Sequence, residues 1–301
     1  MKKLAENRYP HSATLFRFCK EALQIRYTGG VKVIDQDVGA ILGYDPADCS
    51  HWKKGKKNIR SYSTIRTIAD HLNVDDRLLV EITAGKVGLE EALFEYRGYG
   101  NFSLTGKSLE NVRKEYFTNP QRWQQTDSVQ RTSFEEVFRV DRPAIEAIVE
   151  KIVVMGNFIE APIYVPEVFQ LFSNIKIERD ESMGEAVRVI NDGQGANLRT
   201  VVRYKGMEGR PYVRFLMAKE LFLFLVRSGN QMVRHLQQAS SEIIEIQANI
   251  FVENLLVPSR MLGAAIQAAD PTKDLVQQLS ETFWVSKTFM NQRLRDYLEN
   301  I

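Results

Sequence analysis

The residues best suited to chemistry are the adjacent Lys219 and Glu220, which lie in the middle of an apolar run from Val213 to Arg227. The run is apolar on every side of a helix, which is typical of a helix buried inside a domain. Two central charges exclude a membrane span, which needs about 20 apolar residues. Because charged residues are rarely buried without a partner or a role, Lys219 and Glu220 are the first candidates for a site.

The segment Ala218-Lys-Glu-Leu-Phe-Leu223 resembles the Ala-His-Glu-Leu-Gly-His core of the ImmA/IrrE family of zinc metallopeptidases. In that family an H-E-x-x-H helix supplies two histidines that bind zinc and a glutamate that acts as general base. The resemblance places Glu220 at the position of the base. It places Lys219 and Leu223 at the positions of the two histidines.

Three further segments resemble the same family. Residues 245–258 are similar to its second helix and place Gln247 where the third zinc ligand, a glutamate, is usual. Residues 279–294 resemble its closing motif, and residues 145–155 and 162–175 resemble its two opening helices. The resemblance covers residues 142–301 and implies a zincin-like α+β domain with a small sheet.

The residues at the matching positions predict that this domain has lost its metal. A protonated Lys219 repels a dication, Leu223 has no lone pair, and the neutral amide of Gln247 is a poor substitute for a carboxylate. Glu220 then has no zinc-bound water to activate. We therefore expect no catalytic residue, no metal and no cofactor. In our hypothesis the Lys219 ammonium replaces part of the metal's charge and holds Glu220, Gln247 or Glu245.

Length, charge and cysteine content set the broad class. The 301 residues suggest about two domains. Residues 1–85 carry 14 Lys and Arg against 10 Asp and Glu, a net charge of +4, and the remainder carries −2. Two cysteines are too few for a disulfide framework, and the first residues lack the apolar core of a signal peptide. These features favour a cytoplasmic protein whose basic part is N-terminal.

The N-terminal part has the pattern of several short helices. Apolar residues at three- and four-residue spacing predict a first helix over residues 12–27, and Asp35 can cap a short helix that ends at Leu42. A turn at Gly43 is followed by a helix that begins at Pro46, a residue that suits the first helical position. Two short helices joined by a tight glycine turn predict a helix-turn-helix.

A run of cations follows the second of these helices, with five Lys or Arg within residues 51–60. Such a run by itself is typical of a solvated helix end, where cations are favoured. Its surroundings, which include Val38-Gly39, Leu42-Gly43, Trp52 and residues 68–74, resemble the XRE (lambda-repressor-like) helix-turn-helix family. The resemblance covers residues 12–84, and we expect Trp52 to lie in the core.

The XRE resemblance implies a set of DNA contacts, because in this fold the second motif helix enters the major groove. The side chains expected to face bases are Ala47, Ser50 and His51. The side chains expected to face phosphates are Lys53, Lys54, Lys56 and Lys57. Two positions depart from the family pattern: Asp35 replaces a glutamine and would repel a phosphate, whereas Lys53 replaces a glutamate and would attract one.

The remaining segments complete the expected architecture. Residues 86–141 are interpreted as a helical connector, in which Leu109, Val112, Tyr116 and Phe117 are spaced for one apolar helix face. Residues 186–190 and 198–204 predict a β-hairpin before the central helix. The fold class is therefore mainly α, with a helix-turn-helix bundle over residues 1–85, a connector over 86–141, and an α+β pseudo-peptidase domain over 142–301.

Together these interpretations predict a transcription regulator that binds double-stranded DNA as a homodimer. Its C-terminal domain would serve sensing, dimerisation or partner binding. The partner would be a protein or a small-molecule effector, and the effector would bind in a pocket lined by Phe222 and Leu223. An antitoxin-type or other interaction module with autoregulatory DNA binding is an alternative, because antitoxins also carry XRE domains. An active zinc peptidase is disfavoured by the missing ligands. Only four histidines occur, three of them in the N-terminal part. No membrane partner is expected.

Overall fold

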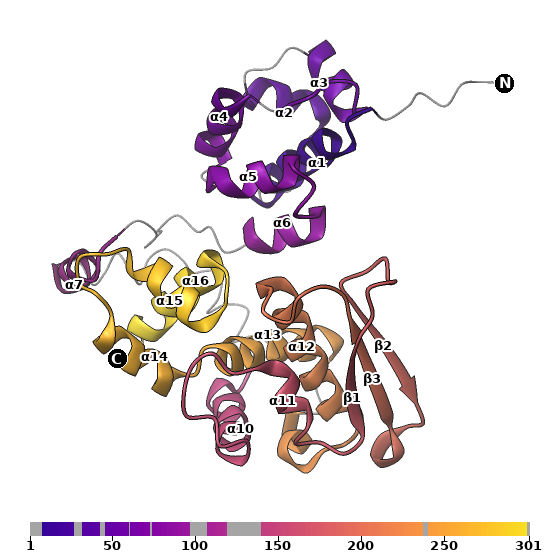
Figure 1. Ribbon diagram of the computed structural model, residues 1–301, viewed down its shortest axis with the longest axis vertical. Coiled ribbons are helices and arrows are strands. Elements are labelled where there is room, and N and C mark those ends of the chain that lie inside the picture. The colour runs from indigo at the N-terminus through magenta and orange to yellow at the C-terminus, as the bar shows by residue number, and fades with distance from the viewer. Residues whose placement is uncertain are drawn as a thin grey trace. The chain divides into compact units, whose positions relative to one another are not determined.

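The chain divides into two compact units, Met1–Asn101 and Phe102–Ile301. The computed structural model describes residues 8–26, 32–42, 46–59, 61–72, 74–96, 107–118, 140–236 and 240–299. The described chain is mainly helical and has a small three-stranded sheet in the second unit, which confirms the predicted fold class at this level (Figure 1). Among the described helices, none is both long and apolar enough to cross a membrane.

The first unit is a bundle of short helices that packs around its first helix. The elements are α1 (Pro10–Arg26), α2 (Asp35–Leu42), α3 (Pro46–Lys53), α4 (Tyr62–Leu72), α5 (Asp76–Thr83) and α6 (Leu89–Tyr96). Helix α1 packs against each of the other five, and α2 also packs against α3 and α4 (Figure 1). The helices predicted over residues 12–27 and 35–42 and from Pro46 onward are therefore confirmed.

The second helix of the predicted motif is tied to α1 by buried polar contacts. Trp52 is fully buried, its ring packs edge-on against Phe16 at 5.2 Å, and its indole N–H donates to the Ser12 carbonyl oxygen at 2.5 Å. The Ser12 hydroxyl accepts from the amide of Ile59 at 3.0 Å. Gly55 follows α3 with φ +64°, a left-handed conformation that favours glycine at a helix end. The prediction that Trp52 is a core residue is confirmed.

The segment interpreted as a connector is shared between the two cores. Helix α6 contributes to the first core, and α7 (Leu109–Thr118) contributes Leu109 and Val112 to the second. The side chains of Tyr116 and Phe117, like residues 97–106 and 119–139, lie outside the described part of the chain. The division into 1–85, 86–141 and 142–301 stays a prediction.

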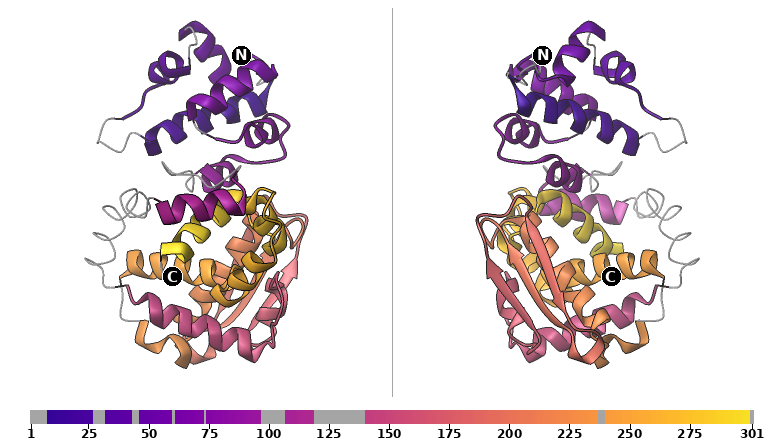
Figure 2. Two further views of the ribbon diagram at one scale, coloured as in Figure 1. Left: turned by 90° about the vertical axis from the view of Figure 1, so that its left-hand side faces the viewer. Right: turned by 90° about the vertical axis from the view of Figure 1, so that its right-hand side faces the viewer.

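The second unit combines a bundle of helices with a sheet on one side of it (Figure 2). After α7, its described helices are α10 (Arg142–Met155), α11 (Val165–Phe169), α12 (Pro211–Arg227), α13 (Ser241–Leu256), α14 (Ser259–Ala268), α15 (Leu275–Phe283) and α16 (Lys287–Glu299). Its strands are β1 (Ile175–Arg179), β2 (Val187–Asp192) and β3 (Arg199–Tyr204), and two 3₁₀ turns lie at Gly195–Asn197 and Gln231–Leu236.

The sheet has the order β1-β3-β2. Strands β2 and β3 form the predicted antiparallel hairpin, with Val189 opposite Val202, and β1 runs parallel to β3 with Ile177 opposite Val202. The helix expected over residues 162–175 is mostly wrong, since only Val165–Phe169 is helical and β1 begins at Ile175. Pairing with the second edge of β3 fixes residues 175–179 as a strand, a contact that the local pattern does not reveal.

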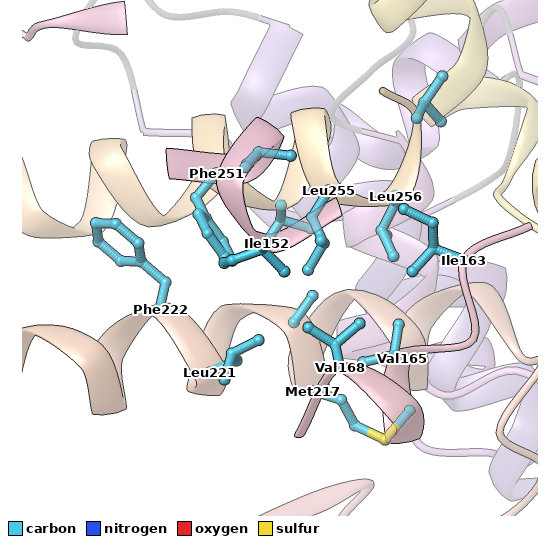
Figure 3. Packing of buried hydrophobic residues seen from close by; sticks show 14 of the residues in the cluster. Ile152, Ile163, Val165, Val168, Met217, Leu221, Phe222, Phe251, Leu255 and Leu256 are labelled. Carbon is cyan, nitrogen blue, oxygen red and sulfur yellow. The ribbon is translucent and has the colours of Figure 1, made fainter. Parts of the chain in front are cut away.

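The central helix α12 is buried as its composition predicts. It packs against α13 and the sheet, and α13 also packs against α10 (Figure 1). Phe222 of α12 lies next to Phe251 of α13, with ring centres 5.1 Å apart, and Met217 and Leu221 line the same core (Figure 3). Helix α12 therefore positions most side chains of the peptidase-like motif.

The buried cation of α12 is Arg214, which is only 1% exposed. Its guanidinium donates to the main-chain oxygens of Phe283 and Trp284, both at 2.5 Å, and to that of Ile163 at 2.8 Å. Burial lowers the pKa of Arg214 to about 10, so the group stays charged at neutral pH. One side chain thus fastens the segment before α11 and the end of α15 to α12.

Replacing Arg214 with Met should lower the free energy of unfolding by about 3–5 kcal/mol, because three buried carbonyl oxygens lose a charged donor. Chemical denaturation followed by circular dichroism measures the change. The matched control is Arg227→Met on the same helix, because the Arg227 side chain is 45% exposed. A surface substitution of this kind should change stability by no more than about 0.5 kcal/mol. Equal losses in the two variants would contradict the role given to Arg214.

Candidate functional site

The peptidase-like site lies where α12 packs against α13, because Lys219, Glu220 and Leu223 are on α12 and Gln247 is on α13. The Lys219 ammonium forms a salt bridge with a carboxylate oxygen of Glu245, one of the three partners expected for it. This ion pair links the two helices. Its Lys219 side chain is partly buried, and its Glu245 side chain is half exposed.

Glu220 lies at the partly exposed edge of the site and not in the core that the apolar run suggested. Its side chain is 23% exposed, and a carboxylate oxygen lies 3.7 Å from Nη1 of Arg227 on the same helix. Burial raises the pKa of Glu220, while Arg227 and Lys219 act in the opposite direction. Glu220 therefore forms its ion pair within one helix.

Gln247 is the deeply buried member of the motif. Its side chain is 3% exposed, and Oε1 has no hydrogen-bond partner among the described residues. A buried acceptor without a partner lowers stability by about 1–3 kcal/mol. Leu223 packs at the edge of the apolar core, and Phe222, which was expected to line an effector pocket with it, is fully buried against Phe251.

These residues do not fit the zinc site of a metallopeptidase. Zinc needs imidazole, thiolate or carboxylate donors, and the three ligand positions hold an ammonium that is paired with Glu245, an aliphatic side chain and a neutral amide. Within the described ranges, no group of three or more His, Cys, Asp or Glu residues is placed to hold a metal ion. The side chain of His235 lies outside the described residues.

In the first unit, helix α3 has one buried and one exposed face. Cys49 and Trp52 are buried, whereas Ser50 and His51, which lie between them in the sequence, are exposed. The side chain of Ala47 lies outside the described part of the chain. The structure therefore leaves two of the three predicted base-facing side chains accessible on one helix face.

The four lysines expected to contact phosphate fall into two classes. Lys53 and Lys20 both donate to Asp35, at 2.5 Å and 2.8 Å, and Lys57 pairs with Asp48 at 2.6 Å. The hydrogen bonds from Lys20 and Lys53 lower the pKa of Asp35, which therefore stays ionised. The expected repulsion by Asp35 and attraction by Lys53 thus largely cancel each other.

Lys54 and Lys56 form the second class. Both are exposed, and neither has an ion-pair partner among the described residues. Lys54 follows α3 directly, and Lys56 follows the left-handed Gly55 that ends it. Their charges are available to a polyanion without breaking an ion pair of the described chain.

Comparison with protein families supports the resemblance of the second unit. Residues 178–295 match the family described as the IrrE N-terminal-like domain (Peptidase_M78), a metallopeptidase-like family. This range contains the sheet from Glu178 onward and helices α12 to α15. No curated protein and no solved structure matched the chain. The predicted ImmA/IrrE-like identity is therefore confirmed for this part of the chain.

Sequence reasoning missed the buried cation Arg214, although it lies in the same apolar run as Lys219 and Glu220. The available signal was an arginine in the first turn of a helix that is apolar on all sides. Glu220 matches the family motif and Lys219 lies beside it, yet both are more exposed than Arg214.

The raised pKa of Glu220 predicts a pH-dependent effect of Glu220→Gln. Because the pKa in the folded protein lies above the unfolded value, folding favours the protonated form, and the wild type loses stability as pH rises between the two values. Glu220→Gln should therefore be more stable than the wild type at pH 7. The difference should disappear below about pH 4, under the ordinary pKa of glutamate.

Thermal unfolding over this pH range measures the effect. Glu178→Gln is the control, because Glu178 lies on the exposed face of β1. A loss of stability in Glu220→Gln at pH 7 would show that the ion pair with Arg227 outweighs burial.

Proposed function

We propose that the chain is a sequence-specific, DNA-binding transcription regulator of the cytoplasm that acts as a homodimer. In this proposal the first unit is an XRE-type helix-turn-helix domain with α2 and α3 as the motif. The second unit is a peptidase-like domain without metal or catalysis that serves sensing, dimerisation or partner binding. The observation that carries the proposal is the accessible face of α3, where Ser50 and His51 lie close in sequence to the exposed Lys54 and Lys56.

The local structure supports DNA binding through α3. Burial of Cys49 and Trp52 fixes the orientation of the helix, so Ser50 and His51 are presented by a rigid element. Base contacts give specificity and phosphate contacts give position and affinity. One small domain reads only a few base pairs, and a dimer would read two half-sites about 34 Å apart.

Replacing Lys54 and Lys56 with Ala should weaken binding to all DNA sequences. The slope of log K against log salt should become shallower by about 0.9 for each phosphate that is no longer neutralised. The matched comparison is Lys53→Ala with Lys57→Ala, which should change the salt slope less, because Lys53 and Lys57 are held in ion pairs with Asp35 and Asp48. Fluorescence anisotropy with a mixed-sequence duplex over a range of salt concentrations measures the affinity and the salt slope of both double variants.

Substitutions on the exposed face of α3 should act differently. Ser50→Ala or His51→Ala should change the preference at single base pairs by about 1–3 kcal/mol, measured by selection of bound fragments from random DNA. Absence of binding to any duplex at low salt would overturn the DNA-binding proposal. Equal effects of the two double-lysine variants would overturn only the division of the lysines into two classes.

The proposed loss of catalysis is tested by elemental analysis of protein purified without chelator. The expected result is no stoichiometric zinc, because Lys219, Leu223 and Gln247 supply no suitable donor. Peptidase activity against an unfolded protein substrate should be absent, both in the wild type and in Glu220→Gln. Stoichiometric zinc that is lost in Gln247→Ala, or proteolysis that is abolished by Glu220→Gln, would show an active metallopeptidase.

A further inference from the structure

A pocket of about 920 Å³ lies at the N-terminal end of α12. Its lining comes from the segments before α11 and α12 and from the end of α15, and it includes Tyr164, Met207, Glu208, Pro211, Glu281 and Trp284. Ligand pockets in proteins have volumes of about 300–1,000 Å³. The pocket is distinct from the peptidase-like site, since Lys219, Glu220, Leu223 and Gln247 do not line it.

The buried Arg214 holds two walls of this pocket in place. Its guanidinium donates to the carbonyl of Ile163, the residue before Tyr164, and to that of Trp284 itself. The guanidinium carbon also lies 5.9 Å from the centre of the Trp284 ring. The two aromatic residues are therefore positioned by one buried charge, and the pocket does not depend on a ligand for its form.

Trp284 has an unusual place for such a large side chain. It ends α15 in the left-handed conformation, with φ +52°, where glycine or asparagine is favoured because a Cβ is strained. Its side chain is nevertheless 45% exposed, and Met207, which also lines the pocket, is 72% exposed. One part of the indole lies beside the Arg214 guanidinium, and the exposed part of its surface is available to a ligand that packs on it.

The charges of the lining favour a cation. Glu208 accepts a hydrogen bond from the Tyr204 hydroxyl at 2.6 Å, which lowers the pKa of Glu208 and keeps it ionised. Glu281 accepts from the side-chain amide of Gln277 at 2.9 Å. Arg210 is the one cation in the described lining, so carboxylates are in excess there. The Arg214 guanidinium lies behind the lining and is bound by three main-chain oxygens. Arg179, which also acts on Glu208, is paired with Glu181 at 2.6 Å.

We propose that this pocket binds a small apolar molecule that carries a positively charged amine. Its apolar body packs on Tyr164 and Trp284, and its ammonium group lies beside Glu208 and Glu281. Aromatic faces and carboxylates both attract cations, so the two parts of the lining select the same chemistry. The proposal stands on the pocket alone and is independent of DNA binding.

The test compares three probes of the same shape: 4-phenylbutylamine, 4-phenylbutanol and 4-phenylbutyrate. Isothermal titration calorimetry with the full chain should show tightest binding of the amine. The carboxylate should bind most weakly, with an affinity about fivefold or more below that of the amine, because Glu208 and Glu281 repel its negative charge. The amine should also change the tryptophan fluorescence in a saturable way, and this change should be lost in Trp284→Phe, which keeps the main-chain carbonyl that Arg214 needs.

Glu208→Gln combined with Glu281→Gln should remove the preference for the amine over the alcohol. The control is Glu178→Gln with Glu185→Gln, which changes the net charge equally at exposed positions outside the pocket. Circular dichroism establishes that each variant is folded. Absence of saturable amine binding would overturn the proposal. The same conclusion would follow from equal binding of amine and carboxylate, or from a preference that is unchanged in the double glutamine variant.

Discussion

The second unit depends on satisfying Arg214, the most deeply buried cation of its described residues, which is 1% exposed, whereas Arg293 and Arg295 are each 5% exposed. Arg214 cannot lose its proton at neutral pH, and burial without partners would cost many kcal/mol. The fold meets this need with main-chain oxygens of Ile163, Phe283 and Trp284, which come from segments far apart in the chain. Any arrangement that moves α15 or the segment before α11 away from α12 would remove hydrogen-bond acceptors from the Arg214 guanidinium while it stays buried in an apolar core. The same constraint shapes the pocket beside it.

Apolar packing links the helices of the peptidase-like domain. Helices α12 and α13 share a core in which Phe222 packs on Phe251 (Figure 3). The Lys219–Glu245 ion pair links the two helices at the edge of this core. Two residues of the expected site lower the stability of the fold. Burial raises the pKa of Glu220, and the Oε1 atom of Gln247 is buried without a partner among the described residues. Apolar packing, which is insensitive to these unfavourable terms, maintains the fold.

In the first unit, internal ion pairs decide which cations are available to a partner. Four lysines in five positions look equivalent in the sequence. Asp35, at the start of α2, pairs with both Lys20 and Lys53, and Asp48 pairs with Lys57, whereas Lys54 and Lys56 have no ion-pair partner among the described residues. A polyanion that bound Lys20 and Lys53 would first have to break their ion pairs with Asp35, and this cost would offset part of its attraction to the two lysines. The four lysines of residues 53–57 therefore attract a polyanion less strongly than their number suggests.

The sequence by itself determined the features that depend on local periodicity. Helices α1, α2 and α3, the hairpin of β2 and β3 and the buried α12 follow from side-chain spacing and local helix-start signals. The motif around Glu220 matched a family that the comparison confirms over residues 178–295. Only the tertiary structure decided that Arg214, not Lys219 or Glu220, is the deeply buried charge of α12. It also showed that residues 175–179 pair as a strand with β3, and that Lys219 pairs with Glu245. The physical reason is that burial and ion pairing depend on residues far away in the chain. Arg214 and Phe283 are 69 positions apart, and no local pattern records that they meet.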